Sequence, residues 1–420
     1  MRIIVRNFVT YSNTNMESLK NLYRIGNGPS SSHTMAPQHA SMIFAEKCPR
    51  AYKYVVTLYG SLAATGRGHM TDQAIINVLQ KHGYVEIEWH PEIRLPFHPN
   101  GMKFEGFGND GCLLDSWTVY SIGGGALSEG KDYDMFSVTN TYALRNLSEI
   151  MAWCYDNGRN FWEYVEMCEQ KDIWDFLQKI WLAMQKCVEA GLDNDGVLPG
   201  PLHLSRKASG YYTRASKYSS SARDKSLIYA YALAASEENA AGHTVVTAPT
   251  CGACGVLPAV LYHLKNTHGF SETRILRALA TAGLIGNVVK QNASISGAEV
   301  GCQGEVGVAC AMAAAAACQL LGGSPSQIEY AAEIGLEHHL GMTCDPIAGM
   351  VQIPCIERNA FAATRALDAQ LYAIQSDGKH RVTFDKVVAV MKQTGHDLPS
   401  LYKETSMGGL ATSLDISQKG

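Results

Sequence analysis

The first 150 residues alternate between two spacings of apolar side chains. Helix-like patterns cover 16–25, 37–47 and 71–83, where apolar residues recur every three or four positions. Stretches rich in β-branched and aromatic residues predict strands at 52–60, 84–90, 102–108 and 116–124. This mixture predicts a small N-terminal α/β domain.

From about residue 160 the strand pattern nearly disappears, and helical stretches follow one another. They cover 161–191, 226–242, 273–291, 305–323, 326–341, 357–375 and 384–395. Many are alanine-rich or apolar on all sides, which is typical of helices inside a bundle. The predicted fold class is therefore α+β. We expect an N-terminal extension at 1–15, the α/β domain at 16–150 and a larger all-helical domain at 151–420.

Charge and hydropathy exclude several kinds of partner. The net charge of −4 offers no electrostatic basis for binding a nucleic acid or a membrane surface. The longest apolar run, 306–321, is shorter than the ~20 residues of a membrane-spanning helix, so it predicts a buried helix. The N-terminus lacks the apolar core of a secretory signal. We expect a cytoplasmic protein with no nucleic-acid or membrane partner.

Twelve cysteines are many for such a chain. In a reducing compartment they are expected to be buried, reactive or metal-binding rather than paired in disulfides. Cys251 and Cys254 form a CxxC motif, but a thioredoxin-like site needs a βαβ context and a zinc ribbon needs a second CxxC. Both contexts are missing from the sequence pattern, so this motif by itself is a weak signal.

Three other cysteines lie where helices begin or in loops. Cys302 stands at the glycine-flanked start of a predicted helix, where the helix N-terminus favours a thiolate. Cys310 and Cys318 follow at intervals of eight residues and drift around the helix, so we expect them to pack in the core. Cys344 and Cys355 lie in a loop region close to prolines.

Three thiolates without a histidine motif suit an iron–sulfur cluster better than zinc, although a four-iron cluster needs four ligands. With three protein ligands, one iron stays open and can act as a Lewis acid toward a hydroxyl or carboxylate. The spacing alone leaves this as one possibility among several.

Long sequence strings resemble those of the iron–sulfur-dependent L-serine dehydratases. The resemblance runs from about residue 19 to 410. It rests on GPSSSHT (28–34), YGSLAATGRGHMTD (59–72), HPNGM (98–102), YSIGGG (120–125), GVLPGPL (196–202), NASISGAEVGCQGEVGVAC (292–310), EHHLGMTCDPIAGMVQIPCIERNA (337–360) and YKETSMGGLA (402–411). The resemblance implies an L-serine ammonia-lyase that makes pyruvate and ammonia in amino-acid catabolism. It also implies a small α/β domain joined to an all-helical catalytic domain.

The resemblance further implies a [4Fe–4S] cluster held by Cys302, Cys344 and Cys355. His69 and His33 become candidates for proton transfer because histidine titrates near neutral pH; which of them is the base stays open. We expect a substrate-binding group whose members offer hydroxyl, amide and backbone donors to a carboxylate. These are Ser30, Ser31, Ser32, Thr34, Asn292 and Ser294.

The chain departs from the family pattern at three places. Ala36 and Cys251 stand where glycine and asparagine are common, and the C-terminus SLDISQKG lacks the cysteine tail of some members. Lys290 lacks the phosphate-binding glycine loop that a pyridoxal phosphate site would need. Cysteine desulfidase, threonine-preferring dehydratase and a non-catalytic cluster sensor remain alternatives, and we expect a homodimer.

Overall fold

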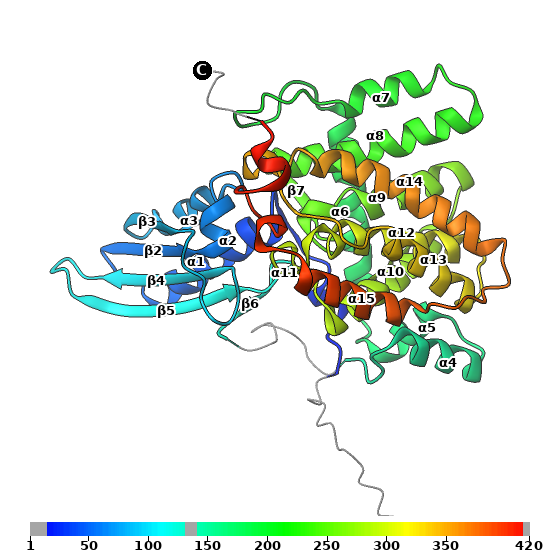
Figure 1. The fold of residues 1–420 in the computed structure, drawn as a ribbon, viewed down its shortest axis with the longest axis horizontal. Coiled ribbons are helices and arrows are strands. Elements are labelled where there is room, and N and C mark those ends of the chain that lie inside the picture. Colours follow the sequence, from blue (N-terminus) through cyan, green and yellow to red (C-terminus); the bar gives the residue numbers. More distant parts are fainter. Residues whose placement is uncertain (1–14, 131–140, 415–420) are drawn as a thin grey trace, which may run out of the picture.

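The computed structural model describes residues 15–130 and 141–414, and Figure 1 shows a small sheet beside a larger group of helices. The sheet has the strand order β3-β2-β4-β5-β6. Its strands are β2 (Lys53–Tyr59), β3 (Tyr84–His90), β4 (Gly101–Phe107), β5 (Leu113–Ser121) and β6 (Leu127–Ser128). Only β2 and β3 are parallel; the other neighbours are antiparallel. The α+β fold class predicted from the sequence is confirmed.

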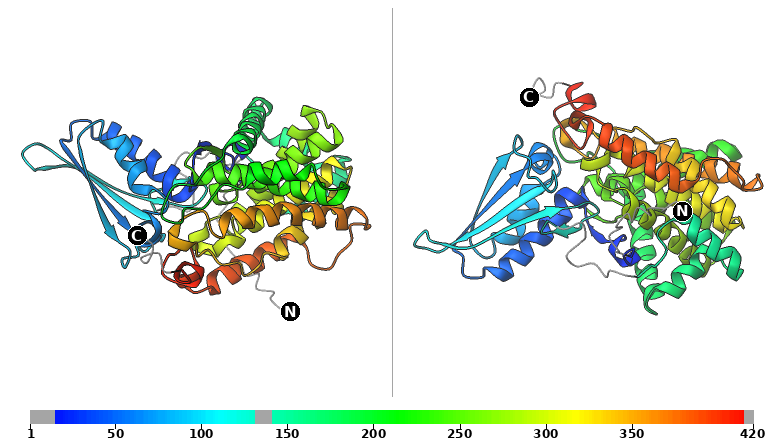
Figure 2. Two further views of the ribbon diagram at one scale, coloured as in Figure 1. Left: turned by 90° about the horizontal axis from the view of Figure 1, so that it is seen from above. Right: turned by 60° about the horizontal axis from the view of Figure 1, so that its bottom comes forward.

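Three helices accompany the sheet: α1 (Ala36–Lys47), α2 (Gly60–Thr65) and α3 (Thr71–Leu79). Helices α1 and α3 pack on each other and against the sheet (Figure 2). β2 has a continuous buried stretch because it has a neighbour on each side, and Phe44 of α1 stacks near Phe104 and Trp117. This small core orients the loop between α2 and α3.

The remaining helices form the larger group. They are α4 (Leu147–Asn157), α5 (Phe161–Cys168), α6 (Ile173–Asp193), α7 (Ala208–Ala215), α8 (Ser220–Ala240), α9 (Val256–His268), α10 (Glu272–Asn292), α11 (Gly297–Val300), α12 (Val306–Leu320), α13 (Pro325–Glu337), α14 (Cys355–Ile374) and α15 (Phe384–Asp397). Helix α12 contacts α9, α10, α13 and α14, and its alanine-rich surface lets them approach from all sides.

The prediction of a buried helix over 306–321 is confirmed by α12, in which Cys310 and Cys318 are fully buried. In the described part of the chain, no single helix has the length and apolar composition of a membrane span. One pair, Gly297–Gln303 with Val306–Leu320, meets that test only when joined across a bend of 52°.

Two predicted helices differ from the structure. The stretch 16–25 holds only a short 3-10 turn, Leu19–Asn21, followed by β1 (Ile25–Asn27), which pairs antiparallel with β7 (Thr244–Val246). Burial of Leu19 and Tyr23 in the larger core and the pairing with β7 override the local helical pattern.

The stretch 161–191 divides into α5 and α6 because the chain becomes extended at Glu169. There the Glu169 carboxylate accepts hydrogen bonds from Ser18 Oγ and Leu19 N.

Two hydrophobic clusters make up the core. The smaller contains buried residues between Ala36 and Leu127, and the larger gathers the helices together with Met16, Leu19 and Tyr23. The predicted extension at 1–15 lies almost wholly outside the described residues, and the domain limits at 16–150 and 151–420 stay predictions.

Candidate functional site

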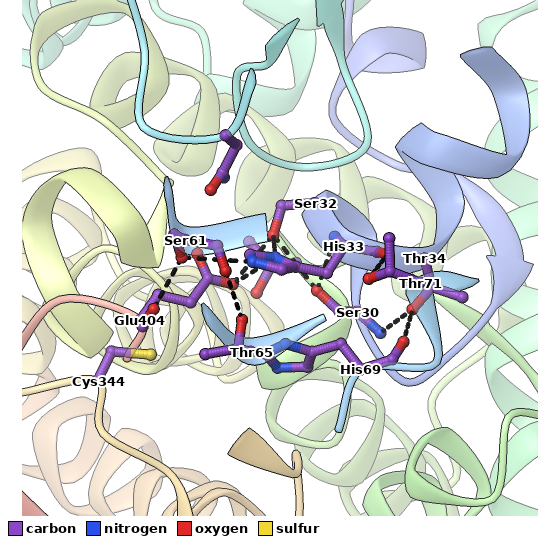
Figure 3. Close-up of polar contacts among 12 residues, drawn as sticks. Ser30, Ser32, His33, Thr34, Ser61, Thr65, His69, Thr71, Cys344 and Glu404 are labelled. Carbon is purple, nitrogen blue, oxygen red and sulfur yellow. Dashed lines mark hydrogen bonds and ion pairs between the residues drawn. The ribbon is translucent and has the colours of Figure 1, made fainter. Parts of the chain in front are cut away.

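His33 lies where the sheet unit meets the helical group. It sits in the π-helical turn Ser31–Met35, which leads into α1, and its side chain is fully buried. Its Nδ1 lies 3.0 Å from Glu404 Oε1 and 2.9 Å from Ser32 Oγ, and its Nε2 lies 3.3 Å from Ser61 Oγ (Figure 3). Both ring nitrogens therefore have polar partners.

His69 lies in the loop between α2 and α3, and its ring centroid is 4.6 Å from that of His33. Burial, followed by the charge of His33, lowers the pKa of His69 to about 3. Its Nδ1 is buried without a hydrogen-bond partner among the described residues. His69 is thus a neutral imidazole with a free nitrogen near pH 7.

The serine-rich loop is a structured turn. Ser30 Oγ accepts a bond from His33 N, and Thr34 Oγ1 donates to His69 O at 2.7 Å. Ser32 Oγ donates to Glu404 Oε1 at 3.1 Å. In the part of the chain that the structure describes, the backbone amides of Ser31 and Ser32 donate to no protein acceptor. Two adjacent free amides at the start of a helical turn can receive an anion.

Cys302 and Cys344 face each other and a buried carboxyl group. Glu305 Oε2 lies 3.8 Å from Cys302 Sγ and 3.7 Å from Cys344 Sγ, while Thr250 donates to the other oxygen at 2.8 Å. The hydrogen bond with Cys344 lowers the pKa of Cys302 to about 7, although burial acts to raise it. The charge of Arg358 also lowers this pKa. Burial raises the pKa of Glu305 well above its usual range.

Cys355 is the first residue of α14 and is buried beside this group. Burial, then the charge of Cys302, raises its pKa, and Arg358 opposes the rise. Arg358 stands one helical turn further along α14 and donates to Thr343 O at 2.6 Å. The structure thus brings together the three cysteines singled out in the sequence, with one cation next to them.

The C-terminal segment joins the histidines to the cysteines. Cys344 N donates to Tyr402 O at 2.8 Å and Thr405 N donates to Cys344 O at 3.2 Å, so Glu404 is carried on a short ladder with Cys344. Figure 3 shows Cys344 and Glu404 side by side below Ser61. Ser61 Oγ donates to Glu404 O at 2.7 Å. One site therefore includes both groups.

Strained backbone surrounds this junction. Met70, Ala348 and Glu404 all have positive φ, and they are three of the four described non-glycine residues that do. Such conformations cost about 1–3 kcal/mol each and persist where neighbouring structure holds them. Met70 follows His69, and Ala348 lies between Cys344 and Cys355.

The structure does not bring Asn292 into this group. Its amide donates to Arg145 O at 2.8 Å, at the end of α10. Ser294 Oγ bonds to Glu299, and Glu299 in turn lies 3.6 Å from His98 Nε2. Ser294 is therefore linked to the site through Glu299 and His98, and through Ser296, whose backbone N donates to Ser294 Oγ at 3.0 Å.

Several buried polar atoms near the histidines have no hydrogen-bond partner among the described residues. They are His69 Nδ1, His98 Nε2, both side-chain atoms of Asn100, Ser296 Oγ and Glu404 Oε2. Buried polar groups without partners are costly, so such a cluster is typical of a site that accepts a polar ligand or water.

Sequence reasoning assigned no role to Glu404, Glu305 or Arg358. Glu404 lies inside the quoted string YKETSMGGLA, and Glu305 follows Cys302 by three residues. Their positions inside quoted strings were the available signal, but the pattern carried no indication that they face the histidines and thiols.

The class of protein that carries this α/β unit and helical bundle is shown by its sequence relatives. The family described as serine dehydratase alpha chain matches residues 45–411. L-serine dehydratase of Streptomyces coelicolor is 40% identical over 94% of this chain and 99% of its own. L-serine dehydratase 1 of Escherichia coli is 39% identical, and the Helicobacter pylori L-serine dehydratase 37%, with the same coverage. The chain belongs to the L-serine dehydratase family.

Proposed function

We propose that this protein is an L-serine ammonia-lyase that converts L-serine to pyruvate and ammonia. The observation that carries the proposal is the meeting of a neutral, buried His69 with three buried thiols around unpartnered polar atoms. Full-length similarity to L-serine dehydratases supports the same reaction.

The residues fit the [4Fe–4S] cluster that the family resemblance implies. Gly297 keeps space open beside the thiols, since a Cβ there would lie 2.7 Å from Glu305 Oε2 and 3.2 Å from Cys344 Sγ. The Arg358 guanidinium offsets thiolate charge. Cys302, Cys344 and Cys355 would hold the cluster, which supplies an open iron as a Lewis acid for the leaving hydroxyl.

The protein's own groups bind and orient the amino acid. The free amides of Ser31 and Ser32 are suited to the substrate carboxylate, with the hydroxyls of Ser30 and Thr34 shaping the turn. His69 is proposed to take the Cα proton on its free ring nitrogen, because only a neutral imidazole can accept one. Loss of water then gives aminoacrylate, which tautomerises and hydrolyses to pyruvate and ammonia.

The other predicted roles are less direct. His33 is proposed to position His69 rather than to take the proton itself. Ser294 is proposed to act through Glu299 and His98, and Asn292 would reach substrate only if its bond to Arg145 O were exchanged.

The reaction is tested by anaerobic reconstitution with iron and sulfide, followed by a pyruvate assay with L-serine. We expect turnover that Cys344→Ala abolishes and that air removes, because an open iron is readily lost on oxidation. Wild-type turnover in both His69→Ala and His33→Ala would refute the histidine assignment. Full activity of Cys344→Ala would refute the cluster assignment.

The same preparation separates three alternative functions. A cysteine desulfidase would release sulfide from cysteine faster than pyruvate from serine, and a threonine-preferring enzyme would favour the larger β-substituent. A cluster sensor would bind iron without turnover, and serine would leave its spectrum unchanged.

We further propose a cytoplasmic homodimer. All twelve cysteines are free, as expected in a reducing compartment. Phe361 and Tyr372 of α14 are largely exposed aromatic side chains of the kind enriched in subunit contacts. Analytical ultracentrifugation measures the subunit number, and a monomer at micromolar concentration would refute this part.

A further inference from the structure

We propose that Glu404, Ser32 and Ser61 hold His33 as a doubly protonated imidazolium, which makes Glu404 a positioning residue for the histidine pair. The inference deepens the proposed function, on which its catalytic part rests. Its structural part rests only on counting donors and acceptors around one buried ring.

Ser61 determines whether Nε2 of His33 carries a proton. The Ser61 hydroxyl has one proton, and it donates that proton to the carbonyl oxygen of Glu404 at 2.7 Å. A carbonyl oxygen can only accept, so the direction of this bond is not in doubt. Ser61 Oγ can then only accept from His33 Nε2, 3.3 Å away. Nε2 therefore carries a proton.

Glu404 determines whether Nδ1 of His33 carries a proton. The carboxylate oxygen Oε1 lies 3.0 Å from Nδ1 and also accepts from Ser32 Oγ at 3.1 Å. If Nδ1 had no proton, Ser32 Oγ, 2.9 Å away, would have to donate its one proton to Nδ1 and give up its bond to the carboxylate. The Nδ1 lone pair would still face Glu404 Oε1 at 3.0 Å in a buried site, which is repulsive. A proton on Nδ1 turns this contact into a charge-assisted hydrogen bond. Both ring nitrogens then carry protons.

The Glu404 carboxylate can act as the counter-ion of a protonated His33. Burial acts to raise the pKa of Glu404, but the charge and hydrogen bond of His33 outweigh it and hold that pKa at about 2. The other titratable groups facing His33 are His69 and His98, and burial lowers the pKa of each, so both are neutral near pH 7. Glu404 is thus the only anion against the ring in the described part of the site.

A permanent cation beside His69 has a chemical consequence. The positive His33 ring, 4.6 Å from His69, disfavours a proton on His69, so this imidazole stays neutral near pH 7 while its basicity is lowered. Because both N–H groups of His33 are already bonded to protein, His33 itself has no free lone pair with which to remove a proton. The two histidines therefore differ in role: His69 accepts the proton, and His33 sets its charge state.

The backbone segment that carries Glu404 also contacts one of the three cysteines. Glu404 lies between Lys403 and Thr405, which pair with Cys344 through backbone contacts. The carboxylate that faces the His33 ring therefore stands on the same backbone segment that pairs with Cys344.

Neutron diffraction from crystals of the anaerobic holoenzyme, grown in deuterated buffer near neutral pD, tests the protonation directly. We expect deuterium on both ring nitrogens of His33 and on one nitrogen of His69. Deuterium on a single nitrogen of His33 would overturn the proposal whether or not the enzyme turns over serine. Absence of serine turnover would instead overturn the proposed function and leave the neutron result intact.

Kinetics test the positioning role. Glu404→Gln keeps the shape and removes the charge; we expect kcat to fall about tenfold or more, toward the range for loss of acid–base assistance, with little change in KM. Glu404→Asp should recover part of the loss. Unchanged kcat in Glu404→Gln, or an equal loss in Glu404→Asp and Glu404→Gln, would contradict the role.

The chain offers a matched control at a second buried carboxylate–histidine pair. Glu329 bonds His380 Nε2 at 2.5 Å and Phe384 N at 2.7 Å, within the helical group. Glu329→Gln removes a similar buried charge and is expected to lower thermal stability while kcat stays at the wild-type value. A comparable kcat loss in Glu329→Gln would mean that Glu404→Gln acts through general destabilisation.

Discussion

Alanine in place of Gly68 is expected to disable the site by forcing its two halves apart. A Cβ on Gly68 would lie 2.6 Å from the carbonyl oxygens of both Ala348 and Gly349. These are backbone atoms, which cannot rotate away as the end of a side chain can. The φ of Gly68 is not in the left-handed region, so alanine adopts the local backbone without strain. The substitution therefore tests the close approach alone.

The size of the effect follows from that distance. Ordinary contact of a Cβ begins at 3.4 Å, so the two loops must separate by about 0.8 Å. One of these loops carries His69, and the other joins Cys344 to Cys355. Because a misplacement of about 1 Å in a catalytic arrangement costs roughly 10²-fold, we expect kcat/KM for serine to fall by about that factor. Overpacking should lower the free energy of unfolding by only ~1–3 kcal/mol.

The assay is steady-state pyruvate formation by the reconstituted enzyme, with iron content and thermal unfolding measured on the same samples. Gly210→Ala is the matched control, because the three atoms nearest to its added Cβ all belong to the flexible end of Arg214 in helix α7. Wild-type kcat/KM in Gly68→Ala with normal iron content would refute the view that the two loops must meet this closely.

Three further substitutions separate other parts of the argument. Gly297→Ala places a Cβ against Glu305 and Cys344, so reconstituted protein should contain less iron per chain than wild type. Cys254→Ala should retain full iron, since Cys254 Sγ points at Ala235 O, 3.7 Å away; iron loss would make Cys254 a fourth ligand. Burial, then Glu337, raises the pKa of Glu333 to about 7 from 4.5. The protonated Glu333 side chain therefore contributes stability that is complete below pH ~4.5 and is lost as the pH rises through 7. Glu333→Gln should raise Tm by ~2 °C or more at pH 8 and leave Tm unchanged at pH 4.

Local sequence patterns predicted the elements that depend on local spacing. Strands β2 to β5 and helices α10 and α12 to α15 lie within a few residues of their predicted limits. Helix α8 begins six residues before its predicted start, and the sequence pattern predicts no helix where α9 lies. The helix predicted at 16–25 is wrong because Leu19 and Tyr23 pack into a core made by residues far along the chain, and β1 pairs with β7 more than 200 residues away. Tertiary contacts of that range cannot be read from a local window.

The sequence likewise identified some of the site residues, while the contacts between them came from the structure. The sequence alone was enough to single out His33, His69, Cys302, Cys344 and Cys355, because histidine and cysteine chemistry and the quoted strings identify them without coordinates. Only the tertiary structure decided which groups touch them. Ser32 and Glu404 are 372 residues apart and 3.1 Å from each other, and the position of Glu404 inside a quoted string does not indicate that it faces a histidine. A residue's type and local spacing are properties of the chain, whereas its partners and charge state depend on what packing removes from water and brings beside it.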